Sequence, residues 1–186
     1  MPGTADQQAL KKECIQLWRS GTKLRTITSA GLSMLPLIPD GSILTFIPCE
    51  ADRSIVFGDI VLFERGDMLV AHRVLNSFYK DGSLWFREKG DNKLLPGVFP
   101  ADCLIGRIVK IEYNDSVHDL TGVQAQRVSR LIAIYYSVLF ALLRSLISLK
   151  HVTFKTAKIP RLRSFVFKTV RILSTVPTSF FKRQLF

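Results

Sequence analysis

Short apolar segments separated by turn residues occupy the middle of this chain and restrict what it can fold into. Five segments rich in β-branched and aromatic residues lie at residues 43–47, 60–63, 69–75, 84–87 and 104–111. The stretches between them contain tight-turn combinations such as Pro39-Asp40-Gly41 and Lys80-Asp81-Gly82. Strand-length runs bounded by such turns are typical of antiparallel hairpins, because antiparallel strands can be joined by very short connections. We therefore expect residues 22–119 to form a mainly β domain.

A helix is predicted before this domain. Residues 5–19 place Leu10, Cys14 and Leu17 on one face at helical spacing, with polar residues between them. This pattern is typical of an amphipathic helix that packs one side against a core. Residues 1–21 are therefore expected to form an N-terminal amphipathic helix.

The net charge of +11 is confined to the end of the chain. All acidic residues lie at or before Asp119, so residues 1–119 hold 14 basic and 15 acidic residues, whereas residues 120–186 hold 12 basic and no acidic ones. A purely basic segment requires a polyanionic partner, either lipid headgroups or nucleic acid. The segment is also rich in Phe, Leu, Ile and Val, which is unlike a solvated nucleic-acid-binding arm. We expect it to bind an anionic membrane surface, and no nucleic acid.

Two helices are predicted within this basic segment. Residues 131–149 form an apolar run interrupted only by three serines and Arg144, which is just long enough to cross a bilayer. Arg144 would cost about 2.5 to 3.5 kcal/mol at the centre of a span, so the sequence leaves open whether the run spans or lies on the membrane. Residues 161–174 mix basic and apolar residues as interfacial helices do. We expect the β domain to fold without residues 123–186.

The compartment is also indicated by the sequence. Cys14, Cys49 and Cys103 are odd in number and widely separated, so they predict neither a disulfide framework nor a metal cluster. The first 26 residues contain no unbroken apolar run, and we expect neither a secretory signal nor an N-terminal span. These features predict a membrane-associated protein on the cytoplasmic side.

Four short motifs follow one another inside the expected β domain. They are GLSMLP at residues 31–36, GDIV at residues 58–61, AHRV at residues 71–74 and KGDN at residues 89–92. Together they resemble the type I signal peptidases and their relatives, which have a Gly-x-Ser-Met-x-Pro loop, a Gly-Asp-Ile-Val strand, a base-bearing strand and a Gly-Asp-Asn turn. The resemblance covers about residues 28–112. It implies a signal-peptidase-type antiparallel β domain that needs neither a metal nor a cofactor.

The resemblance assigns Ser33 as the nucleophile and His72 as its base. A serine hydroxyl is a poor nucleophile near neutral pH and needs an adjacent base to take its proton. Histidine, with an ordinary pKa of about 6.5, can do so without the deep burial that a lysine requires. Most bacterial signal peptidases have lysine at this position, so His72 places the resemblance in the endoplasmic-reticulum and archaeal type. Met34 is expected to anchor the loop in apolar surface.

An acid usually orients a catalytic histidine. The resemblance implies Asp91, in the Gly-Asp-Asn turn, with Asp102 as second choice. The histidine branch has further aspartates five and six residues after Asp91, where this chain has Pro96 and Gly97. A Ser-His dyad without an acid therefore stays open. For the oxyanion, only the backbone N–H of the nucleophile is implied.

These residues predict a serine endopeptidase that cleaves an extended peptide or protein precursor. Family substrates carry small side chains before the cut and bind as an added strand. The missing aspartates favour one alternative, a catalytically inactive adaptor that keeps the peptidase fold at a membrane surface. The two hypotheses differ in whether Ser33 and His72 come within hydrogen-bond reach.

Overall fold

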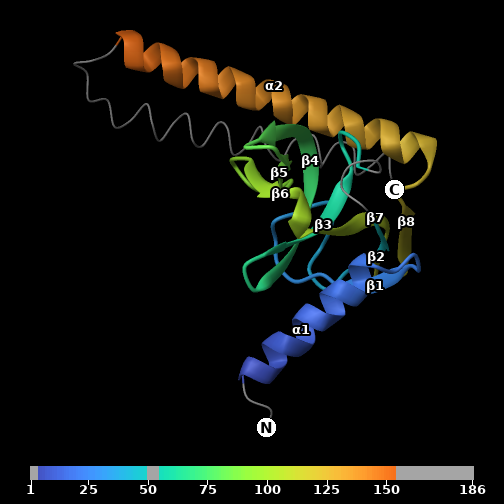
Figure 1. Ribbon diagram of the computed structural model, residues 1–186. Helices are drawn as coiled ribbons and strands as arrows, with labels where there is room; N and C mark the ends of the chain where they lie inside the picture. Colours follow the sequence, from blue (N-terminus) through green and yellow to red (C-terminus); the bar gives the residue numbers. More distant parts are fainter. Residues whose placement is uncertain (1–3, 50–54, 154–186) are drawn as a thin grey trace.

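A computed structural model describes residues 4–49 and 55–153 as a mainly β protein with a helix at either end (Figure 1). Helix α1 (Thr4–Arg19) precedes the sheet and helix α2 (Val123–Thr153) follows it. The strands are β1 (Arg25–Thr28), β2 (Ile43–Pro48), β3 (Ile60–Arg65), β4 (Met68–Lys80), β5 (Ser83–Lys89), β6 (Gly97–Pro100), β7 (Leu104–Tyr113) and β8 (Ser116–Asp119), with a 3-10 turn η1 (Ala101–Cys103). The predictions of a mainly β fold and an N-terminal helix are confirmed. The helix predicted at residues 161–174 lies outside the described residues.

All strand pairs are antiparallel, and the strands form one curled sheet. Their order is β1-β2-β7-β3-β4-β5-β6, and β8 pairs with β7. The register fixes the places of His72 and Glu88 in the sheet. Val61 on β3 lies opposite His72 on β4, and Glu88 on β5 lies opposite Gly97 on β6.

The sheet encloses two hydrophobic clusters. In the first, α1 packs Ile15 and Trp18 against β2 and β7, with the Trp18 and Phe46 rings 5.6 Å apart, edge to face. The second lies between β3, β5 and β6, where Phe63 and Phe99 stack with ring centroids 3.9 Å apart. The alternating apolar residues of the strands therefore form a core that holds β4 and β5 in fixed register.

Helix α2 lies across the sheet and contacts β4 (Figure 1). Its inner face buries Val128, Ile132 and Tyr136 in a third cluster with Leu75 of β4. The first half of α2 thus belongs to the packing of the β domain. The expectation that the β domain folds without residues 123–186 stays a prediction, and such a deletion would uncover Leu75 of β4.

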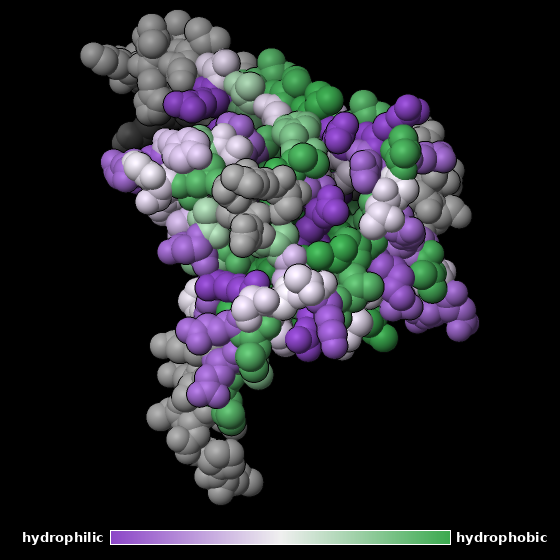
Figure 2. All heavy atoms as spheres, turned by 45° about the vertical axis from the view of Figure 1, so that its right-hand side comes forward, coloured by the Kyte–Doolittle hydropathy of each residue, from purple (hydrophilic) through white to green (hydrophobic). Residues whose placement is uncertain are grey.

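The outer face of α2 is exposed and, from residue 131 onward, mainly apolar. It presents Val123, Leu131, Ile134, Val138 and Leu142, and Figure 2 shows hydrophobic side chains along the upper edge of the molecule, where α2 runs. Residues Val123–Ser145 are long and apolar enough to cross a membrane, with a mean hydropathy of 1.4. By length and composition this helix is compatible with membrane association. The core helix of a soluble protein can have the same length and composition.

Two neighbouring residues on α2 allow a matched test of its docking. Ile132 is 1% exposed and Leu131 is 50% exposed. We expect Ile132→Ala to lower the free energy of unfolding by about 3 kcal/mol, because it leaves a cavity beneath the helix. Leu131→Ala should lower it by less than about 1 kcal/mol. Urea denaturation of both variants measures the difference, and equal effects would show that α2 does not dock as described.

Candidate active site

Ser33 and His72 lie within hydrogen-bond reach of each other. Ser33 is half-buried on the loop between β1 and β2, and His72 is buried on β4. The serine Oγ lies 3.0 Å from His72 Nε2. Met34, next to the serine, is buried in the first cluster and anchors the loop as expected.

The turn at residues 90–92, named here the bracing turn, holds the serine loop. The backbone N–H of Asn92 donates to the carbonyl of Ser33 at 2.8 Å, and its side-chain amide donates to the carbonyl of Leu32 at 2.9 Å. The backbone N–H of Asp91 donates to the Met34 sulfur at 3.4 Å. Each of these contacts joins the turn to the serine loop, so the position of the loop depends on the turn.

Gly90 lies directly against the serine and the histidine. A Cβ at this position would lie 2.7 Å from the Ser33 carbonyl oxygen and 2.8 Å from His72 Nε2. Both distances are far below van der Waals contact, so the turn reaches this place only with a glycine.

The carboxylate beside His72 comes from Glu88, which none of the sequence motifs contains. Glu88 Oε2 lies 2.5 Å from His72 Nδ1, and its other oxygen accepts a hydrogen bond of 2.7 Å from Arg65 Nη2. An ionised carboxylate can only accept, so the hydrogen-bond network assigns the imidazole proton to Nδ1. His72 Nε2 is then the unprotonated nitrogen, and it can accept the hydroxyl proton of Ser33.

Glu88 is kept charged despite its burial. Burial alone would raise the pKa of Glu88, but the hydrogen bond to His72 and the bound Arg65 hold that pKa below its usual range. Arg65 also lies over the ring of Phe63, 5.0 Å from its centroid. The carboxylate therefore stays an acceptor for His72 near neutral pH.

The space for this carboxylate is created by Gly97. A Cβ at Gly97 would lie 2.2 Å from Glu88 Oε1, so any side chain here would displace the carboxylate. Gly97 is also one of the two positions where the resemblance implies an aspartate. In this fold Glu88, the strand partner of Gly97, places its carboxylate beside His72 instead.

Asp91 does not face His72, which corrects the expectation that it orients the histidine. Its carboxylate accepts two hydrogen bonds from Arg73, at 3.0 Å from Nε and 2.7 Å from Nη2, and neither side chain is exposed. Burial alone would lower the pKa of Arg73, but the Asp91 charge raises it above its usual value. Asp102, the second choice, lies on η1, where it helps burial to raise the pKa of the Cys103 thiol.

One signal for Glu88 is present in the sequence. Side chains alternate between the two faces of a strand, and Phe86 and Glu88 share one face of β5. Phe86 is buried in the core, so its face carries Glu88 inward as well. The predicted strand at residues 84–87 ended one residue too early to include the glutamate.

Among the described residues, no group of His, Cys, Asp and Glu is placed to hold a metal ion.

No protein-family model matches this chain, and no curated protein is significantly similar to it in sequence. A serine hydroxyl, an imidazole nitrogen and a carboxylate in line form an arrangement that can activate the serine as a nucleophile.

The reactivity of Ser33 should depend on Glu88. We expect Glu88→Gln to slow covalent labelling by a fluorescent fluorophosphonate by roughly 10³-fold, because an amide can donate to Nδ1 and favour the tautomer protonated at Nε2. Asp102→Asn, the matched carboxylate-to-amide control, should leave the labelling rate within about twofold. If both variants label at the same rate, Glu88 does not orient His72.

Proposed function

We propose that this protein is a serine endopeptidase that uses Ser33, His72 and Glu88. The observation that carries the proposal is the hydrogen-bonded line from the serine Oγ through the imidazole to the buried carboxylate. In this mechanism Ser33 attacks a peptide carbonyl while His72 Nε2 takes its proton and then protonates the leaving amine. The backbone N–H of Ser33 would stabilise the oxyanion, and water would release the acyl group by the same route.

The proposed relatives are the type I signal peptidases of the histidine type. The residues that carry this resemblance, distant in sequence, lie around one site: the serine loop, the His72 strand and the Gly-Asp-Asn turn. The chain departs from the pattern in its acid, which comes from Glu88 on β5. We accordingly propose an extended peptide or protein precursor as substrate, with a small side chain before the scissile bond.

Substitution of the nucleophile tests this function. We expect Ser33→Ala to abolish cleavage of quenched fluorescent peptides that carry alanine before the scissile bond, while the midpoint of thermal unfolding stays close to wild type. Ser83→Ala, at an exposed serine at the start of β5, should cleave at the wild-type rate. Cleavage by Ser33→Ala at the wild-type rate contradicts the proposal. A wild-type protein that cleaves none of these peptides would favour the inactive adaptor.

We also propose that α2 lies on an anionic membrane surface, on the cytoplasmic side. The inner face of α2 is docked on the sheet as far as Tyr136, and only 13 residues of the apolar run, 137–149, follow before Lys150; as a helix they measure about 20 Å. A bilayer core is about 30 Å thick, so this part is too short to span while the domain stays docked. The exposed apolar face and the 12 basic residues of positions 120–186 suit an anionic interface instead.

Vesicle binding tests this second proposal. The protein should sediment with vesicles containing anionic phosphatidylserine, bind neutral phosphatidylcholine vesicles more weakly, and lose affinity as salt rises. The variant Val138→Ser/Leu142→Ser should bind roughly tenfold more weakly, because it removes apolar area from the outer face. Val117→Ser, at an equally exposed position on β8, is the matched control. Equal binding to both vesicle types would contradict the charge argument.

A further inference from the structure

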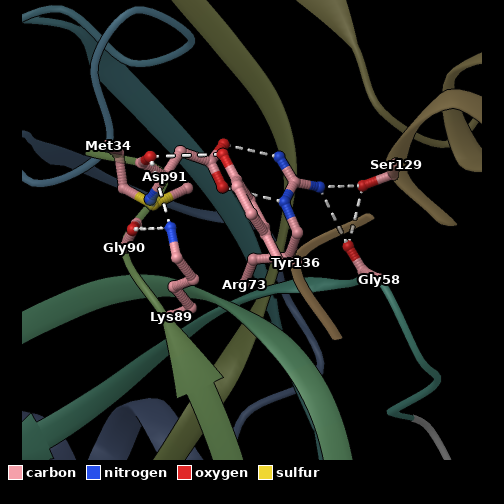
Figure 3. Close-up of polar contacts among 8 residues, drawn as sticks. All are labelled: Met34, Gly58, Arg73, Lys89, Gly90, Asp91, Ser129 and Tyr136. Carbon is pink, nitrogen blue, oxygen red and sulfur yellow. Dashed lines mark hydrogen bonds and ion pairs between the residues drawn. The ribbon is translucent and has the colours of Figure 1, made fainter. Parts of the chain in front are cut away.

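Helix α2 reaches the bracing turn through Tyr136 (Figure 3). The Tyr136 hydroxyl donates a hydrogen bond of 3.2 Å to the backbone carbonyl of Asp91. The tyrosine is 1% exposed, and its ring lies under the ammonium group of Lys89, 3.6 Å from Nζ to the ring centroid. A residue of the C-terminal helix thus contacts the turn that holds the serine loop.

Lys89 makes a parallel set of contacts to the same turn. Its ammonium donates to the carbonyl of Gly90 at 3.2 Å and lies 3.5 Å from the carbonyl of Asp91. Burial lowers the pKa of Lys89 to about 8, opposed by the Asp91 charge, so the side chain is still mostly charged at neutral pH. The Tyr136 ring face stabilises this buried cation. The carbonyls of the turn are therefore held by one lysine and one tyrosine that contact each other.

A second connection runs from α2 to the side chain of Asp91. Ser129 donates to the carbonyl of Gly58 at 2.7 Å and contacts Nη1 of Arg73, the arginine that pairs with Asp91. Helix α2 therefore holds Asp91 twice, at its main chain through Tyr136 and at its side chain through Arg73. Figure 3 shows these contacts converging on Asp91 from the helix and from β4.

We propose that Tyr136 is a positioning residue for the proposed peptidase reaction. Tyr136 holds the bracing turn, and the turn holds Ser33 in line with His72 through the Asn92 hydrogen bond and the close approach of Gly90. The inference rests on the proposed function and deepens it, because it makes α2 part of the unit that sets the catalytic geometry.

The substitution Tyr136→Phe isolates this role. It removes the hydroxyl and keeps the ring under Lys89, so the packing of α2 is preserved. We expect kcat for the alanine-containing peptides to fall about fivefold, with KM within about twofold, because a single hydrogen bond to the turn is lost. The rate of fluorophosphonate labelling of Ser33 should fall by the same factor, since that reaction reports the nucleophile without a peptide substrate. Tyr113→Phe, at a partly exposed tyrosine of β7, is the matched control.

A second variant and a stability measurement separate positioning from folding. Tyr136→Phe/Ser129→Ala weakens both connections to Asp91 and should lower kcat further, at a temperature where urea titration shows each variant fully folded. If both variants keep kcat and labelling within twofold of wild type while Ser33→Ala is inactive, Tyr136 does not position the site. If kcat falls only in proportion to the unfolded fraction of each variant, the role of Tyr136 is structural and the inference is overturned. An active Ser33→Ala would instead overturn the proposed function, and this inference with it.

Discussion

The ion pair between Arg73 and Asp91 joins β4, the bracing turn and helix α2 inside the protein. Both side chains are fully buried, and the guanidinium binds the carboxylate through two hydrogen bonds. The same arginine contacts Gly58 before β3 and Ser129 on α2. Removing one partner of a buried pair leaves an uncompensated charge and typically costs about 3 to 5 kcal/mol. Strand β4, the bracing turn, the start of β3 and helix α2 are all joined at this pair.

The pleat of two neighbouring strands separates this structural pair from the candidate active site. His72 and Arg73 are adjacent on β4, so their side chains point to opposite faces of the sheet. Glu88 and Lys89 are adjacent on β5 and divide in the same way. One face brings Glu88 to His72 and Ser33, and the other places Arg73 and Lys89 around Asp91. The bracing turn that follows β5 contacts both sets, so it links the ion pair to the serine.

Helix α2 has two faces with different environments. The inner face adds Tyr136 and Ser129 to the polar network around Asp91. The outer face is mainly apolar from residue 131 onward, with Arg127 and Arg130 exposed before it, and further basic residues follow in the sequence. Under the two proposals, the element that contacts lipid is also the element that holds the bracing turn. A docked helix can serve both purposes only if it lies along the membrane surface.

Local patterns in the sequence predict the long strands and the N-terminal helix, because alternation, turn residues and helical spacing involve only neighbouring residues. Ser33 and His72 were predicted together through the family resemblance of four short ordered motifs. The strands β1, β6 and β8 have four residues each, and their strand state depends on partners that local patterns do not identify. Tertiary structure alone decided which acid meets His72. Asp91 is already paired with Arg73, and the register of β5 against β6 sets Glu88 beside the open space at Gly97. It also decided what covers α2, because hydropathy measures how apolar a helix is and contains no information about whether protein or lipid packs against each face.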